Sequence, residues 1–291
     1  MSAFLLFVVV ISWGLSWYAI GLQLGEVPAL VSIAYRFVLA ALLLAGLLMV
    51  TGRFKPIAWK WHGLLAGLGF CLFSMNFFCF YLAAEFLPSG LLSIIFATAA
   101  IMGAFNQRIF FGVRLNRRVL AGAATGIIGL VLLSWDSITG PKQNGPLFFL
   151  ALPFLGTYLF SLGNLVSVRL SHDHDLPNIV AHGMAYGAAI CIAICLVMGL
   201  DFPLPADPVY WGSLVYLSAV ASVVAFLTYL SLVNREGPAR AAYATVLFPI
   251  VAMIVSTVLE GFVWTALASL GVMLALGGTL LVFSRPKVRP N

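Results

Sequence analysis

Ten runs of about 20 mostly apolar residues follow one another along the chain, separated by short connections rich in Gly, Pro, Asp and Asn. A helix of this length crosses the hydrocarbon core of a bilayer, where only helices and closed barrels satisfy their backbone polar groups. With 63% hydrophobic and 8% charged residues, the chain also has too few charges for a soluble fold. The sequence therefore predicts an all-α membrane protein with ten transmembrane helices. The predicted spans are 3–21, 30–50, 63–84, 90–111, 119–135, 147–169, 178–199, 210–233, 239–259 and 265–283.

The second half of the chain repeats features of the first at an offset of 149 residues. The matching positions are Gly14/Gly163, Gly63/Gly212, Gly112/Gly261, Gly122/Gly271, Gly129/Gly278, Pro28/Pro177 and Pro56/Pro205. Each half holds five spans, and an odd number inserts the two halves with opposite orientation. We therefore expect two inverted five-helix repeats, the architecture of many transporters. The repeats are 1–138 and 147–284, joined by an external loop at 139–146 and followed by a basic cytoplasmic tail at 285–291.

The basic residues indicate the orientation in the membrane. Thirteen of the 15 Lys and Arg lie on alternate connections or in the tail, and six of the nine acids lie on the other side. The positive-inside rule then places both termini in the cytoplasm. The net charge of +6 is thus a topology signal, and we expect no nucleic-acid partner. Because no basic segment precedes the first run, we expect a retained span and not a cleaved signal peptide.

Polar and aromatic side chains recur at helical spacing in several spans. In span one, two serines are four residues apart, and so are two tryptophans. Span six carries four polar residues at successive intervals of four, three and three positions. Spans three, four, eight and nine add an amide, hydroxyls and aromatic rings. Such residues either pack helices together or line a cavity. The candidate substrate-binding residues are Trp13, Ser16, Trp17, Asn76, Phe77, Phe80, Ser93, Phe96, Tyr158, Ser161, Asn164, Tyr229, Tyr243 and Thr245.

Two titratable residues inside spans have candidate roles. Arg36 lies about two turns into span two, where a charge is costly unless it is paired, so it contacts a carboxylate or fixes helix packing. His182 is the candidate proton relay, because no Asp or Glu lies near the middle of a span. A lone His is more often a packing residue, which favours facilitated transport or exchange. We expect no cofactor and no metal site, since the HDHD segment at 172–175 falls in a turn.

Spans five and ten are rich in glycine and poor in polar groups, which is typical of close helix packing. We expect them to form a scaffold or a dimer contact, in a protein that is a monomer or a weak homodimer.

Several short segments carry a resemblance to a known family. They are SWG at 12–14, RF at 36–37, the P-x-x-V pair at Pro28 and Pro177, the glycines that follow FGVRL at 111–115, and Pro249 in LFPIVA. Through them the whole chain resembles the EamA-type ten-span transporters of the drug/metabolite transporter superfamily, and most of all the bacterial aromatic amino acid exporters of the YddG type. Two departures are visible. Ala100 stands at the position equivalent to Pro249, and Val113 replaces a family glutamate, with Glu260 shifted in the second half.

The resemblance implies that spans one, three, four, six, eight and nine surround a central cavity. It also implies a bacterial inner-membrane exporter of aromatic and other neutral amino acids and related metabolites. Alternating access would use bends such as that at Pro249. The partners would be the small-molecule substrate and membrane lipids. One alternative is a sugar-phosphate or nucleotide-sugar transporter, for which only Arg36 offers a deep cation. The other is a polytopic membrane enzyme, for which we find no catalytic pair and therefore expect no enzymatic activity.

Overall fold

The computed structural model describes residues 2–25, 27–112, 117–135, 147–236 and 244–283. Across these ranges the regular elements are helices and none is a strand. The first half contains α1 (Ser2–Gly21), α2 (Ala29–Val50), a 3-10 turn (Trp59–Trp61), α3 (His62–Phe73), α4 (Met75–Ala84), α5 (Ser89–Phe96), α6 (Ala99–Phe111) and α7 (Arg117–Leu133). Spans three and four are therefore each two helices, interrupted at residue 74 and at residues 97–98.

The second half contains α9 (Leu147–Leu170), α10 (Leu176–Val197), α11 (Pro208–Val215), the π-helical segment η2 (Tyr216–Val224), α12 (Ala225–Glu236), α14 (Ala244–Leu259) and α15 (Ala266–Phe283). Seven helical stretches in the described ranges are long and apolar enough to cross a membrane, and α14 and most of α15 form two shorter apolar helices. The prediction of an all-α, multi-span membrane protein is confirmed.

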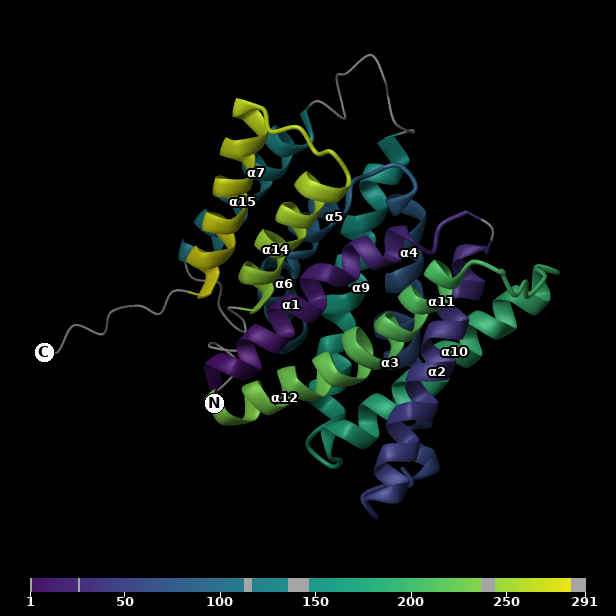
Figure 1. Ribbon diagram of the computed structural model, residues 1–291. Helices are drawn as coiled ribbons and strands as arrows, with labels where there is room; N and C mark the ends of the chain where they lie inside the picture. The colour runs from purple at the N-terminus through teal and green to yellow at the C-terminus, as the bar shows by residue number, and fades with distance from the viewer. Residues whose placement is uncertain (1, 26, 113–116, 136–146, 237–243, 284–291) are drawn as a thin grey trace, which may run out of the picture.

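The helices form one bundle with paired helices at its two sides (Figure 1). Helices α7 and α15 pack together at one side, and α2 and α10 pack together at the other. Helices α1 and α9 run between these pairs, and Trp13 and Phe160 on them contact both apolar clusters of the core. This central position makes α1 and α9 the natural walls of any internal site.

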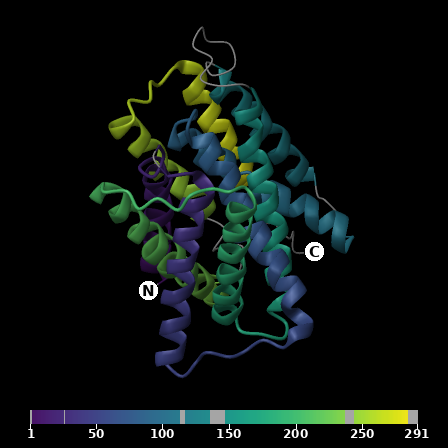
Figure 2. The same ribbon diagram turned by 90° about the vertical axis from the view of Figure 1, so that its right-hand side faces the viewer.

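Most charged residues of the described chain lie at the two ends of the bundle. The α2–α3 connection and the turn between α9 and α10 lie at the same end (Figure 2) and carry Arg53, Lys55, Lys60 and Arg169. We call this the basic end. The connections at the opposite end carry Glu85, Asp201, Asp207 and Glu260.

Glycines allow α7 and α15 to touch backbone to backbone. A Cβ at Gly271 would lie 2.5 Å from the Leu133 nitrogen and 2.7 Å from the Gly129 oxygen. A Cβ at Gly278 would lie 2.5 Å from the Gly122 oxygen. No larger residue fits these positions unless the helices separate.

We therefore expect Gly271→Ala to lower stability by about 1–3 kcal/mol, because the new methyl group meets backbone atoms that cannot move independently. Gly277→Ala is the matched control, since a Cβ there meets nothing within 4 Å. Thermal unfolding of the two purified variants in detergent measures the difference. Equal melting temperatures would show that this contact is not tight.

Candidate functional site

A cavity lies between the two halves of the chain, with walls from α1, α2, α4, α5, α9, η2, α12 and α14. Its empty space, including its mouth, is about 510 Å³, of which about 50 Å³ can hold the centre of a water molecule. This space suits a small molecule and not a polymer. The lining residues are Trp13, Ser16, Trp17, Ile20, Arg36, Asn76, Phe77, Phe80, Phe96, Phe160, Ala221, Phe226 and Phe248.

Trp17 is at the centre of an aromatic cage. Its ring centroid lies 5.0 Å from that of Phe80 and 5.5 Å from that of Phe96, both edge-to-face, and 6.4 Å from that of Phe248 in a stacked arrangement. The Trp17 indole nitrogen is buried and has no hydrogen-bond partner. A buried N–H without a partner is costly, so this group is available to a ligand.

Trp13 extends the cage towards the second half. Its indole N–H donates to the Ala221 carbonyl at 3.2 Å, within the π-helical segment. Its ring lies 5.2 Å from Tyr229 and 5.5 Å from Phe226. π-Helical turns are rare and are often found at functional sites. Here the turn supplies a carbonyl that fixes the orientation of a cavity-wall tryptophan.

Close approach of α1 and α14 brings these tryptophans to Phe248. A Cβ at Gly14 would lie 2.6 Å from the Val251 Cβ and 3.1 Å from the Phe248 oxygen. Glycine at this position therefore allows two helices from different halves to form one wall.

Asn76 joins α4 to α9 in the cavity wall. Its side chain is 1% exposed, and its Nδ2 donates to the Gly156 carbonyl at 2.9 Å. It follows the break at Ser74, whose hydroxyl donates to the carbonyls of Gly69 and Phe70 at 3.1 and 3.0 Å. The break thus starts a new helix that presents Asn76, Phe77 and Phe80 to the cavity.

Arg36 is the cation in the cavity wall. It is 2% exposed, its Nε donates to the Ser222 hydroxyl at 3.2 Å, and its guanidinium lies 4.3 Å from the centre of the Phe77 ring. The Ser222 hydroxyl in turn donates to the Leu217 carbonyl at 2.8 Å. One terminal nitrogen of the guanidinium, Nη1, has no partner.

Several predicted residues lie outside the cavity lining. Ser93 and Thr245 are buried, and the Ser93 hydroxyl donates to the Gly90 carbonyl at 2.6 Å. Ser161 accepts a hydrogen bond from the Asn106 amide at 2.9 Å, at the contact between α6 and α9. Tyr229 contacts the Trp13 ring but is not among the residues that line the cavity.

Tyr158 and Asn164 are exposed on α9 and do not line the cavity. Pro249 is buried within α14, next to Phe248. Tyr243 lies outside the described residues. His182 is at the basic end, where its Nδ1 lies 2.8 Å from the Asn178 carbonyl and its ring stacks on Phe54.

Five lining residues were not among the sequence candidates: Ile20, Phe160, Ala221, Phe226 and Phe248. The repeat contained a signal for Phe226, which is the equivalent of Phe77 at the offset of 149 residues. Phe248 precedes the predicted bend at Pro249. Ile20, Phe160 and Ala221 carry no distinguishing signal in the sequence.

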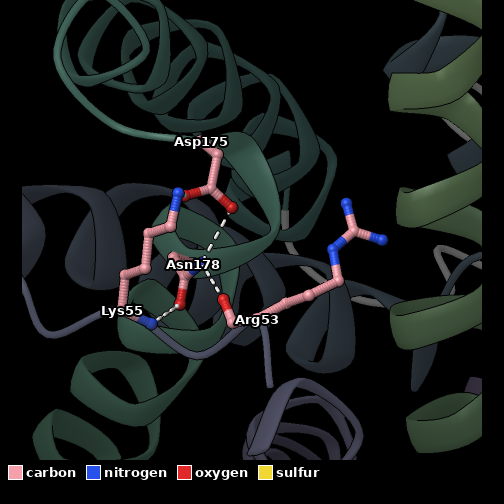
Figure 3. A network of polar contacts seen from close by, with 4 residues as sticks. All are labelled: Arg53, Lys55, Asp175 and Asn178. Atoms are coloured by element: carbon pink, nitrogen blue, oxygen red, sulfur yellow. Dashed lines mark hydrogen bonds and ion pairs between the residues drawn. The ribbon is translucent and has the colours of Figure 1, made fainter. Parts of the chain in front are cut away.

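Asn178 ties the two halves together at the basic end (Figure 3). Its Oδ1 accepts from the Lys55 backbone N–H at 2.8 Å, and its Nδ2 donates to the Arg53 carbonyl at 3.0 Å and to the Asp175 carboxylate at 2.8 Å. The Lys55 ammonium lies 4.0 Å from the same carboxylate. We call this set of contacts the Asn178 clasp.

Glu260 makes a second connection at the opposite end. Its Oε2 accepts from the Ser89 backbone N–H at 3.0 Å and from the Ser89 hydroxyl at 2.9 Å. The carboxylate thereby caps the first turn of α5. We call this the Glu260 clasp. It also joins the two halves, because Glu260 directly follows α14 and Ser89 begins α5.

Comparison with known proteins places this architecture in a family. The chain is 26% identical over 287 residues to a probable amino-acid metabolite efflux pump of Salmonella typhimurium, covering 95% of this chain and 93% of the relative. It is 25% identical to the uncharacterized inner membrane transporter YedA of Escherichia coli (98% and 94% covered). It is 28% identical to a probable biotin transporter of Pseudomonas aeruginosa (97% and 95% covered).

A protein of known crystal structure has the same fold, with a TM-score of 0.67 at 16% identity over 96% of this chain and 95% of that protein. The pattern of the EamA-like transporter family matches residues 1–135 and again residues 147–284. Because this pattern covers both halves, the predicted family is confirmed, and the protein belongs to the EamA-like transporter family.

Proposed function

We propose that the protein is an inner-membrane exporter of aromatic and other neutral amino acids and related metabolites. The observation that carries the proposal is the cavity between the halves, with its aromatic cage around Trp17 and a few fixed polar groups. Apolar walls with a small number of polar groups are typical of small-molecule sites. The names of two relatives, an amino-acid metabolite efflux pump and an inner membrane transporter, support the same function and location.

The proposed mechanism is alternating access by two inverted five-helix repeats in a ten-span chain. The contact of α7 with α15 supports this symmetry. The offset of 149 residues relates Gly129 to Gly278 and Gly122 to Gly271. It therefore converts the Gly129–Gly271 contact into the Gly122–Gly278 contact. Spans three and eight, which are equivalent, both depart from regular α-helix, at Ser74 and in the π-helical segment.

The proposed topology places the basic end in the cytoplasm. Transport would be facilitative or by exchange, since no carboxylate is among the cavity-lining residues in the described ranges. His182 does not line the cavity. Close packing of α7 with α15 uses the glycines of spans five and ten inside one chain, which favours a monomer or a weak homodimer.

Counterflow in liposomes tests the function. We expect purified protein in vesicles loaded with unlabelled phenylalanine to accumulate labelled phenylalanine, and to accumulate leucine or methionine more weakly, with and without a pH gradient. Protein-free liposomes are the control. Uptake of a sugar phosphate without uptake of any amino acid would favour the alternative substrate class. Strict dependence on the pH gradient would instead indicate proton coupling through His182.

A further inference from the structure

Arg36 is a buried cation without a counter-charge in the described part of the chain. The ion pairs found there are Lys55–Asp175 and Arg169–Asp173, and both lie at the basic end. Arginine stays protonated at any accessible pH. A full positive charge is therefore held inside the bundle, in a residue that is 2% exposed.

The neighbours of Arg36 orient the guanidinium but do not neutralise it. They are the Ser222 hydroxyl, the rings of Phe77 and Phe37 at 4.3 and 5.3 Å, and the Tyr81 hydroxyl. Tyr81 donates its own proton to the Gln23 amide oxygen at 2.7 Å. Each of these groups is neutral, and together they fix the plane of the guanidinium.

An unpaired charge at this depth costs several kcal/mol, and removing it would relieve that cost. The guanidinium belongs to the cavity wall, and its Nη1 has no partner. Because Nε is occupied by Ser222 and the guanidinium also meets the Tyr81 hydroxyl, Nη1 is the donor that remains. An arginine N–H forms a charge-assisted hydrogen bond with a carboxylate, which is about twice as strong as a hydrogen bond between neutral groups.

We propose that Arg36 binds the carboxylate of the transported substrate, while the aromatic cage around Trp17 holds the apolar part. This inference rests on the proposed function and specifies its substrate class. The site takes apolar or aromatic monocarboxylates, and the carboxylate matters more than the amino group, for which the cavity-lining residues in the described ranges offer no acid.

Matched carboxylate and carboxamide compounds test the inference. The probes are phenylalanine, 3-phenylpropionate, phenylalaninamide and 3-phenylpropanamide, each used as a competitor in phenylalanine counterflow. The same compounds are added to purified protein to measure thermal stabilisation in detergent, with sodium chloride as the salt control. A charge-assisted pair corresponds to about 10- to 100-fold in affinity. We therefore expect each carboxylate to compete and to stabilise the protein at a concentration about 10- to 100-fold lower than the corresponding amide requires.

Variants assign the preference to Arg36. Arg36→Gln should fold with an unchanged or higher melting temperature and should bind carboxylate and amide equally. Arg36→Lys keeps the charge but not the planar fork, so it should retain part of the preference. Arg117→Gln, the same change in an exposed side chain at the start of α7, should behave as wild type.

The two proposals fail in distinguishable ways. Binding that prefers carboxylates without transport of any amino acid would contradict the proposed function and leave the role of Arg36 intact. Any of three results would overturn the role of Arg36. They are amides as effective as carboxylates in the wild type, a carboxylate preference retained by Arg36→Gln, and equal stabilisation by sodium chloride.

Discussion

Trp17→Ala is expected to lower the rate of phenylalanine counterflow at least about tenfold, because it removes the ring at the centre of the aromatic cage. The side chain is 7% exposed and faces Phe80, Phe96 and Phe248. Each aromatic pair contributes about 0.5–1.5 kcal/mol beyond simple burial. A substrate ring that stacks in this cage would lose contacts of the same kind.

Trp17→Phe separates the role of the ring from that of the indole N–H. It keeps an aromatic wall but removes the buried nitrogen that has no partner in the protein. We expect an intermediate loss if the N–H binds substrate, and a rate near wild type if the ring alone matters. Trp59→Ala is the matched control, since this tryptophan is 83% exposed at the basic end. Wild-type transport by a well-folded Trp17→Ala would place the substrate elsewhere.

The positions of the helices could be predicted from the sequence because lipid leaves the backbone no alternative to helices of this length. The predicted first span, 3–21, corresponds to α1 at Ser2–Gly21, and the predicted second, 30–50, to α2 at Ala29–Val50. The interruptions inside spans were not predictable in the same way. Ser74 is neither Gly nor Pro, yet its φ of −138° and ψ of −81° depart from α-helical values.

The π-helical segment also has no signal of its own in YLSAVASVV. Side chains from other spans bond to this segment, the Trp13 indole N–H to the Ala221 carbonyl and the Arg36 Nε–H to the Ser222 hydroxyl. Tertiary contacts of this kind are invisible to helical periodicity.

Aromatic residues at helical spacing led to much of the candidate site, since Trp13, Trp17 and Phe80 do line the cavity. Polar periodicity was less informative. In span six, Ser161 meets Asn106 at a helix contact and Asn164 is exposed. A hydroxyl or amide in a span serves helix packing as well as it serves a ligand, and only the neighbouring helix decides between the two.

The Asn178 clasp and the Glu260 clasp join the two halves at opposite ends of the bundle. In an alternating-access carrier, a contact that closes one end stabilises the state that is open at the other. Loss of the Glu260 clasp should therefore favour the outward-open state, and loss of the Asn178 clasp should favour the inward-open state. Hydrogen bonds to a charged group contribute about 1.5–3 kcal/mol each, so each loss should change the ratio of the states about tenfold or more.

Accessibility of the cavity measures this ratio. We expect a cysteine introduced as Ser16→Cys, with the four native cysteines replaced by alanine, to report it through labelling by an impermeant maleimide added outside. Glu260→Ala should speed labelling and Asn178→Ala should slow it. Glu85→Ala and Asn164→Ala remove an exposed acid and an exposed amide and should leave the rate unchanged.

The opposite signs are what separate gating from a loss of stability. A variant that merely loosens the bundle exposes the cavity more, whichever end is altered, so both clasps would then raise the labelling rate. Faster labelling in both variants would therefore contradict a gating role and reduce the clasps to structural contacts. Slower labelling in Asn178→Ala cannot come from loosening, and it would link a buried amide at the basic end to closure of the opposite end.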